Sequence, residues 1–288
     1  MQPQIQSFFD PETHTITHVV ACRETRQCAV IDPVLDYDFK AGRTSETALE
    51  PVRQYIRKEG LTLQWVLETH AHADHLSSSQ HLRCPDSAPV GIGAHIRDVQ
   101  VSFKELFNLE PEFPVDGSQF QHLFEDGESF GIGHLKVTVM HTPGHTPACV
   151  TYCMADCAFV GDTLFMPDYG TARCDFPGGD ARTLYRSIQK ILALPDQTRL
   201  FLCHDYLDGT HRTEYAWETT VAEQKAGNIH VHEGVTEEAF VALREARDAS
   251  LDMPLLLLPS IQVNIRAGDL PPPEGNGIRY LKIPLNVL

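Results

Sequence analysis

The stretch Thr69-His70-Ala71-His72-Ala73-Asp74-His75 places three imidazoles and a carboxylate within six consecutive residues. Imidazole nitrogen and carboxylate oxygen are ligands that borderline divalent metals prefer. The preceding segment, 63–68, is predicted to be a strand, and an extended chain points His70 and His72 to the same side. The stretch therefore predicts a metal site where a strand ends and a loop begins.

Three further predicted strands lead into ligand-type residues. They end at His141-Thr142-Pro143-Gly144-His145, at Gly161-Asp162-Thr163 and at His204-Asp205-Tyr206. A single histidine at a strand end is more often a structural hydrogen-bonding group than a ligand. Four such ends in one chain, all expected at the same edge of a sheet, instead predict one shared metal site.

The rest of the chain alternates strands and hairpins with helices. Helices are expected over residues 47–59, 76–82, 96–107, 182–194 and 237–249. Strands are expected over residues 15–22, 27–31, 63–68, 89–94, 129–131, 135–140, 149–152, 157–160 and 199–203. Because no repeat or low-complexity linker divides the chain, we expect one α/β domain over residues 1–288 with mixed sheets. Residues 225–288 would form a C-terminal helix and tail that contribute to the substrate pocket.

Composition narrows the function class and the location. The 288 residues carry a formal net charge of −16, which argues against a nucleic acid partner and against an anionic membrane surface. No segment approaches the roughly 18 apolar residues that a bilayer span requires. The N-terminal residues lack the basic and apolar regions of a signal peptide, and none of the eight cysteines forms a Cys-x-x-Cys pair. We therefore expect a cytoplasmic protein without a disulfide framework, in which Cys149, Cys153 and Cys157 are small fillers of a hairpin.

The run His70-Ala71-His72-Ala73-Asp74-His75 resembles the H-x-H-x-D-H signature of the metallo-β-lactamase superfamily. His145, Asp162 and His204 fall where that superfamily places its remaining ligands. The resemblance covers most of the chain, from about residue 15 to about residue 206. It implies an αββα sandwich in which two mixed β-sheets pack face to face, helices lie outside and the metal sits at one edge.

Within the superfamily, three segments resemble persulfide dioxygenases, which are related to glyoxalase II. Thr171-Ala172-Arg173-Cys174-Asp175-Phe176 is similar to their Gly-Arg-x-Asp-Phe element, although Thr-Ala stands where Cys-Gly is often found. His204-Asp205-Tyr206 fits them better than the His-Glu-Tyr of glyoxalase II. The segment 259–266 resembles their C-terminal substrate segment. Glyoxalase II also closes with a helical glutathione-binding domain that is not recognisable after Gln224.

The residues alone allow two metal arrangements. Two metals could be held by His70, His72 and His145 and by Asp74, His75 and His204, with Asp162 bridging them, which suits hydrolysis. A single Fe(II) held by two histidines and one carboxylate would leave positions open for O₂ and substrate. The resemblance implies the second arrangement, with one Fe(II) per chain on His70, His145 and Asp162. In that arrangement His72, Asp74, His75 and His204 would hold water or orient the ligands.

The reaction that the resemblance implies is oxidation of glutathione persulfide by O₂ to sulfite and glutathione. Glutathione carries two carboxylates, so its pocket needs cations despite the acidic surface. The candidate substrate-binding residues are Arg173, Tyr206, Lys225, Asn264, Ile265 and Arg266, and the candidate catalytic residues are Arg173, Tyr206, His75 and His204. The cations also have structural interpretations: Arg173 could pair with Asp175, Lys225 could be a solvated surface residue and Arg266 could brace the Pro-rich tail.

Two other functions remain open at this level. One is a glyoxalase II-like thioester hydrolase with a dinuclear zinc site, which the complete ligand set would also serve. The other is a non-catalytic protein that binds a metal or a persulfide. Because members of the resembled family are often dimers, the resemblance is compatible with a homodimer. Cys174 lies next to Arg173 but has no activating histidine or lysine adjacent in sequence, so we interpret it as a buried filler.

Overall fold

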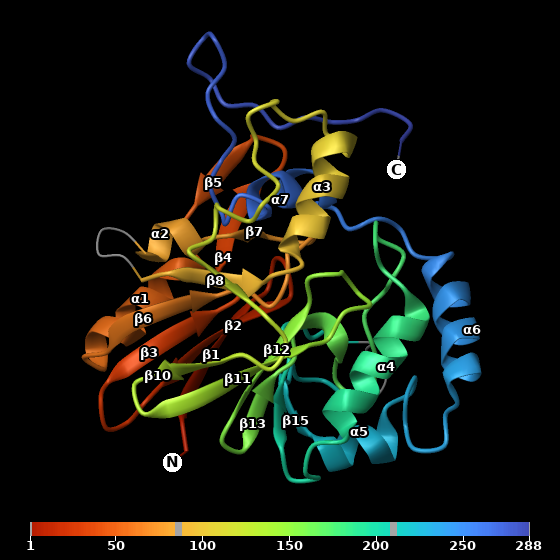
Figure 1. The fold of residues 1–288 in the computed structure, drawn as a ribbon. Coiled ribbons are helices and arrows are strands. Elements are labelled where there is room, and N and C mark those ends of the chain that lie inside the picture. Colours follow the sequence, from red (N-terminus) through yellow and green to blue (C-terminus); the bar gives the residue numbers. More distant parts are fainter. Residues whose placement is uncertain (1, 84–87, 208–211, 288) are drawn as a thin grey trace.

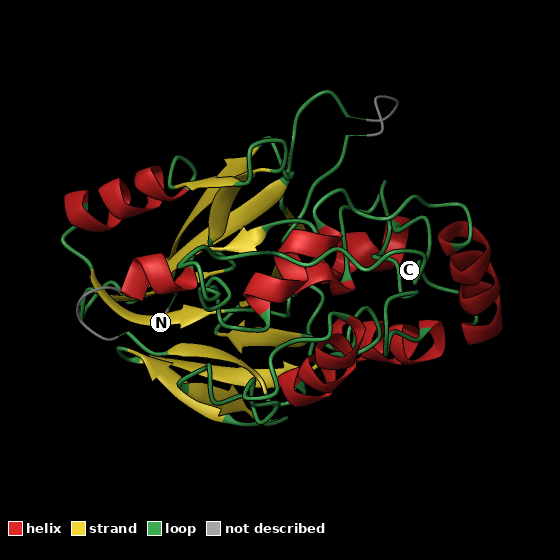
Figure 2. Cartoon of the chain, turned by 90° about the horizontal axis from the view of Figure 1, so that it is seen from above, coloured by secondary structure: helices red, strands yellow, loops and turns green. Residues whose placement is uncertain are grey.

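The computed structural model describes residues 2–83, 88–207 and 212–287. Two six-stranded sheets dominate it, and Figure 2 shows the strands as two layers with helices around them. In spatial order, the first sheet contains β1 (Gln4–Asp10), β2 (Thr15–Ala21), β3 (Gln27–Ile31), β6 (Thr62–Leu67), β8 (Val90–Gly93) and β9 (His122–Phe124). The second contains β10 (Ser129–Ile132), β11 (Leu135–His141), β12 (Val150–Met154), β13 (Cys157–Phe159), β14 (Arg199–Phe201) and β15 (Glu218–Thr220).

Both sheets are mixed, as the sequence predicts. The pairs β3–β6, β6–β8, β8–β9 and β13–β14 are parallel, and the remaining pairs within the two sheets are antiparallel. A smaller sheet consists of β5 (Arg43–Ser45), β4 (Val34–Asp38) and β7 (Leu76–Ser77). Since β12 is antiparallel to both β11 and β13, and β13 is parallel to β14, the carboxyl ends of β11, β13 and β14 meet at one edge.

The helices cover the outer faces of the sandwich. They are α1 (Leu49–Lys58), α2 (Ser79–Arg83), α3 (Ile96–Leu106), α4 (Ala181–Leu192), α5 (Val221–Gly227), α6 (Glu237–Asp248) and α7 (Leu257–Asn264), with a 3₁₀ turn at Gly161–Thr163. Figure 1 shows α4, α5 and α6 together on one side of the molecule, while α1, α2, α3 and α7 lie with the first sheet. None of the helices in the described ranges is long and apolar enough to span a bilayer.

Three apolar layers hold this arrangement together. The middle layer joins side chains of both sheets, among them Ile31 and Leu67 from the first and Tyr152 and Phe159 from the second. A second layer packs the outer face of the first sheet against α1, α3 and α7. A third packs the second sheet against α4 and α6. Burial of these faces is the main stabilising contribution, and it gives the αββα sandwich that the sequence predicts.

Two local expectations differ from the structure. The segment 76–82 is not one helix, because Leu76–Ser77 pairs with β4 and only Ser79–Arg83 is helical. The Ser77 N–H also donates to the side chain of Asn264, a tertiary contact that overrides the local helical pattern. The second difference is that several elements were not expected. They are the strands β1, β4, β5, β9 and β15 and the helices α5 and α7, the last of which forms within the segment 259–266 and its N-terminal flank.

The cysteine expectations hold where the structure describes them. Cys149 precedes β12, and Cys153 and Cys157 lie in the β12–β13 hairpin; all three carry free thiols. Burial raises the pKa of Cys149 to about 12, so this thiol stays protonated and acts as a small apolar group. Cys84 lies outside the described residues.

Candidate metal centre

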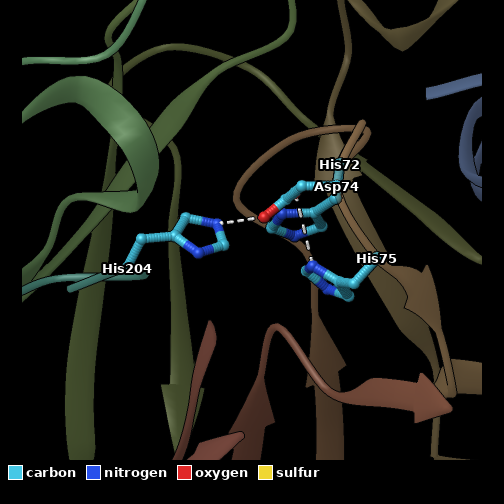
Figure 3. A group of neighbouring side chains, drawn as sticks. All are labelled: His72, Asp74, His75 and His204. Atoms are coloured by element: carbon cyan, nitrogen blue, oxygen red, sulfur yellow. Dashed lines mark ion pairs between the residues drawn. The ribbon is translucent and has the colours of Figure 1, made fainter. Parts of the chain in front are cut away.

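Ligand-type side chains from both sheets converge at one edge of the sandwich. The expectation of a single sheet edge is therefore wrong in one respect, because β6 carries its histidines from the first sheet and β11, β13 and β14 belong to the second. Four groups of described residues have ligand atoms that all lie within 4.8 Å of one another, and two of them consist entirely of candidate ligands: His70, His145 and Asp162, and His72, Asp74, His75 and His204. Figure 3 shows the second group, with Asp74 between His75 and His204.

Asp162 belongs to the first group and also approaches His204 of the second. Its Oδ2 is 3.7 Å from His70 Nε2 and 3.6 Å from His145 Nε2, while its Oδ1 is 3.4 Å from His204 Nε2. Gly161 brings Asp162 to this place: it adopts a φ of +52°, and a Cβ there would lie 2.7 Å from Thr69 Oγ1. Glycine permits both the backbone conformation and the close approach to the histidine-bearing loop.

The residues fit a metal because their inward-facing atoms have no hydrogen-bond partner. Buried polar atoms are normally satisfied, so a cluster of unsatisfied donors and acceptors at a single place is typical of a metal-binding site. The unsatisfied atoms here are His70 Nε2, His72 Nδ1, Asp74 Oδ2, His75 Nε2, Asp162 Oδ1 and His204 Nε2. His204 Nε2 lies 3.0 Å from Asp74 Oδ2, but the pair does not have hydrogen-bond geometry. All are nitrogen or carboxylate oxygen donors, which suits zinc or iron.

The opposite ring nitrogens are held by the surrounding chain. His145 Nδ1 lies 2.7 Å from the carbonyl oxygen of Arg173, and His70 Nδ1 lies 3.0 Å from Thr69 Oγ1. Thr15 Oγ1 lies 3.3 Å from His75 Nδ1 and 3.4 Å from His204 Nδ1. Contacts of this kind fix the orientation of metal-binding imidazoles and turn the other nitrogen toward the metal.

Asp32 and Glu68 are site residues that the sequence reasoning missed. Asp32 Oδ1 lies 3.0 Å from His72 Nε2, and its two oxygens accept hydrogen bonds from the Thr69 N–H and hydroxyl. Glu68 Oε2 lies 3.3 Å from the same His72 nitrogen. Asp32 directly follows the strand 27–31, and this position at a strand end could have indicated from the sequence that it belongs to the site.

Burial and charge set the protonation of the histidines differently. Burial lowers the pKa of His70 well below its usual value, and the neighbouring His72 and His145 add to the effect. Burial also lowers the pKa of His75. Burial would lower the pKa of His72 too, but the Asp32 and Glu68 carboxylates outweigh it and raise that pKa well above its usual value. The neutral rings of His70 and His75 keep a lone pair for a metal.

A cavity of about 340 Å³ opens beside Asp74, His145 and Asp162. Two of the candidate substrate-binding residues, Arg173 and Tyr206, line it. Arg173 also makes a forked ion pair with Asp175, at 2.6 and 2.7 Å. It therefore lines the cavity and also makes the structural pair with Asp175 that the sequence allowed. Burial raises the pKa of Tyr206 well above its usual value, and its ring stacks on His204. C-terminal residues form much of the remaining wall: Arg244, Arg247, Leu251, Asp252, Pro254, Leu255 and Leu256.

Four predicted substrate residues do not line this cavity. Lys225 pairs with Asp196 at 2.7 Å, and Arg266 pairs with Glu110 at 2.6 and 2.9 Å. Ile265 is buried in the core beside the first sheet. Asn264 lies close to the candidate metal ligands but contacts their backbone. Its side-chain amide donates to the backbone carbonyls of His72 and His75, each at 2.8 Å. Asn264 thus braces the histidine-bearing loop.

Cys174 is buried beside the cavity. Its N–H donates to the Asp248 carboxylate at 3.0 Å, and burial together with that carboxylate raises the pKa of the thiol. A protonated thiol is a poor nucleophile, which agrees with its interpretation as a filler.

The sequence profile of the metallo-β-lactamase superfamily matches residues 13–204, which include every candidate metal ligand. The chain belongs to the metallo-β-lactamase superfamily. It is 52% identical to a probable metallo-hydrolase of Burkholderia pseudomallei, with 99% of each chain covered. It is also 50% identical to glyoxylase B2 of Dictyostelium discoideum, covering 99% of this chain and 98% of that protein.

More distant members of the superfamily include a named dioxygenase. The chain is 31% identical to the mitochondrial persulfide dioxygenase ETHE1 of Bos taurus, over 94% of this chain and 91% of that protein. Among solved structures, ETHE1 from Myxococcus xanthus superposes with a TM-score of 0.73 at 28% identity and covers 92% of this chain and all of that one. These matches agree with the sandwich fold and with a metal-binding His/Asp cluster at its edge.

Proposed function

We propose that the protein is a non-haem Fe(II) dioxygenase that oxidises glutathione persulfide to sulfite and glutathione. The observation that carries the proposal is the group His70, His145 and Asp162, which offers two imidazoles and one carboxylate. His145 and Asp162 border the cavity. This donor set is typical of iron oxygenases with open coordination positions. The similarity to persulfide dioxygenases supports the same assignment.

A ferrous ion bound by these three residues would supply the redox chemistry that O₂ needs to react with closed-shell sulfur. The protein's own contribution is placement. The Arg173 carbonyl holds His145 through Nδ1, and the cavity beside Asp162 offers a place for the reacting sulfur. In the balanced reaction, one persulfide, one O₂ and one water give glutathione, sulfite and two protons.

Tyr206 is assigned a substrate-positioning role in this reaction. A tyrosine hydroxyl is protonated at neutral pH, and burial raises the pKa of Tyr206 further, so the hydroxyl can donate to an anionic persulfide sulfur. Asp74, His75 and His204 lie across Asp162 from His70 and His145 and would hold the water that the reaction consumes. Arg173 lines the cavity wall, where Asp175 neutralises its charge, and its backbone carbonyl holds His145.

A thioester hydrolase with two metals is the second candidate. The group His72, Asp74, His75 and His204 favours it, because each of its four residues has a buried atom without a hydrogen-bond partner, as only His70 and Asp162 have in the first group. Asp162 stands where a bridging ligand between two metals would stand. The similarity to glyoxylase B2 points the same way.

Two assays on metal-loaded protein separate the candidates. O₂ consumption with glutathione persulfide, with sulfite formed in equal amount, is expected of the dioxygenase. Hydrolysis of S-lactoylglutathione without O₂ uptake would overturn that proposal. His204→Ala provides a second test: the dioxygenase should keep most of its iron, whereas a dinuclear hydrolase should lose one of its two metals.

A further inference from the structure

The lining of the cavity beside the candidate metal ligands contains three arginines. They are Arg173, Arg244 and Arg247, and the last two come from α6. At about 340 Å³, the cavity falls within the roughly 300–1,000 Å³ range of small-molecule sites. Which of these cations is available to a ligand depends on the partners each already has.

Arg173 and Arg244 are already occupied. Arg173 binds the Asp175 carboxylate through two nitrogens and donates its third to the carbonyl of Asp252 at 2.7 Å. Arg244 is only 1% exposed; it pairs with Asp248 and donates to the Thr171 carbonyl at 3.0 Å. Each guanidinium is therefore neutralised by a protein carboxylate, and neither adds a free positive charge to the cavity.

Arg247 differs from both. It lies three residues after Arg244, so the two share one face of α6. The buried contacts of Arg244 fix that face toward the cavity. The Arg247 side chain is exposed, its guanidinium lies 5.9 Å from the centre of the Tyr169 ring, and no carboxylate of the described residues pairs with it. Tyr169 in turn contacts Tyr206, with ring centres 5.0 Å apart.

We infer that Arg247 binds a carboxylate of the glutathione moiety of the substrate. The inference rests on the proposed function, because it assumes that the reacting sulfur is bound to glutathione. Glutathione has two carboxylates, and an arginine fork held over an aromatic ring suits a carboxylate with little loss of side-chain freedom. Arg247 thus takes the place that the sequence analysis gave to Lys225 and Arg266, whose charges are paired elsewhere.

The test is equilibrium binding, which does not depend on turnover. Metal-loaded protein is titrated with S-methylglutathione, whose sulfur is blocked, and with its diethyl ester, which lacks both negative charges. The wild-type protein should bind the diacid about tenfold more tightly than the diester, the effect of one solvent-accessible charge-assisted pair. Arg247→Ala should weaken binding of the diacid about tenfold and leave the diester unchanged.

Matched variants sharpen the result. Arg247→Lys keeps the charge and should retain part of the preference for the diacid. Arg57→Ala removes another exposed arginine, on α1 and paired with Glu50, and should bind both ligands as the wild type does. If Arg247→Ala keeps the preference for the diacid, or if the wild-type protein has none, the inference is wrong. O₂ uptake with glutathione persulfide is measured separately, so failure of the dioxygenase proposal would be distinguishable.

Discussion

His145 donates its Nδ1–H to the backbone carbonyl of Arg173 across 2.7 Å. A carbonyl only accepts, so this contact fixes the tautomer of His145 and leaves the Nε2 lone pair facing Asp162. It also joins two separate sequence motifs. The loop that follows β11 supplies the ligand, and the segment 171–176, which resembles a persulfide dioxygenase element, holds it in place.

This geometry predicts that His145→Ala and Asp162→Ala each lose most of their iron. Each substitution removes one of three ligands, and Asp162 is also the residue between the two groups. Iron per chain, measured after anaerobic purification, checks the outcome. His141→Ala is the control, because His141 stacks on His95 and donates to the Pro147 carbonyl outside the cluster. Stoichiometric iron in either ligand variant would refute the assignment.

Asp32→Asn should weaken metal binding about 10–100-fold, the usual cost of losing a residue that orients a ligand. Asp32 receives two hydrogen bonds from Thr69, whose hydroxyl lies 3.0 Å from Nδ1 of the candidate ligand His70, and it also contacts His72 Nε2. Its charge therefore orients His70 through Thr69. Competition with a chelator measures the affinity. Asp98→Asn, an exposed carboxylate on α3, should bind metal as the wild type does. An unchanged affinity in Asp32→Asn would remove Asp32 from the site.

Arg244→Ala should destabilise the protein by about 3–5 kcal/mol, because it leaves the buried Asp248 carboxylate without its cation. Urea unfolding at neutral pH measures the loss. Replacing both partners, as in Arg244→Met with Asp248→Met, should recover a large part of it, since no charge then stays buried. A loss below about 1 kcal/mol in Arg244→Ala would show that α6 is not anchored by this pair.

His18 should make stability fall in mild acid. Burial lowers its pKa from 6.5 to about 4, and the opposing effect of the Leu202 carbonyl, which lies 2.9 Å from His18 Nε2, is smaller. Between these two values the unfolded chain binds more protons than the folded one, so the free energy of unfolding rises with pH across this window. Stability is fully present above pH 6.5, and about 3 kcal/mol is lost as the pH falls to about 4.

His18→Gln isolates this contribution, because other titrating groups cancel in the comparison with the wild type. Glutamine retains an amide that can donate to the Leu202 carbonyl, but it does not titrate. The difference in unfolding free energy between the two proteins should narrow as the pH falls. A difference that stays constant from pH 7 to pH 4 would rule out His18 as the cause.

The candidate ligands were predictable because both the end of a strand and a ligand-type side chain can be recognised from a few neighbouring residues. His70, His145, Asp162 and His204 each follow an apolar strand, and the superfamily signature fixes their order. The expected helices at 47–59, 96–107, 182–194 and 237–249 correspond to α1, α3, α4 and α6 for the same reason. Their apolar residues recur at helical spacing and pack on the sheets.

The cavity wall was not predictable, because it depends on which charges find partners after folding. Lys225 and Arg266 are cations of the right type, but Asp196 and Glu110 neutralise them away from the cavity. Arg247 lies on a helix whose sequence shows only an amphipathic pattern, and its availability follows from Arg244 holding that helix in place. The role of Asn264 was also not predictable from the sequence. Its side chain was expected to bind substrate, but it donates hydrogen bonds to two backbone carbonyls of the loop instead.

Elemental analysis of protein purified without air and without added metal tests the central claim most directly. The account predicts about one iron per chain, held by His70, His145 and Asp162, and little zinc. Two zinc ions per chain, one of them lost in His204→Ala, would contradict it and identify the dinuclear site of a hydrolase.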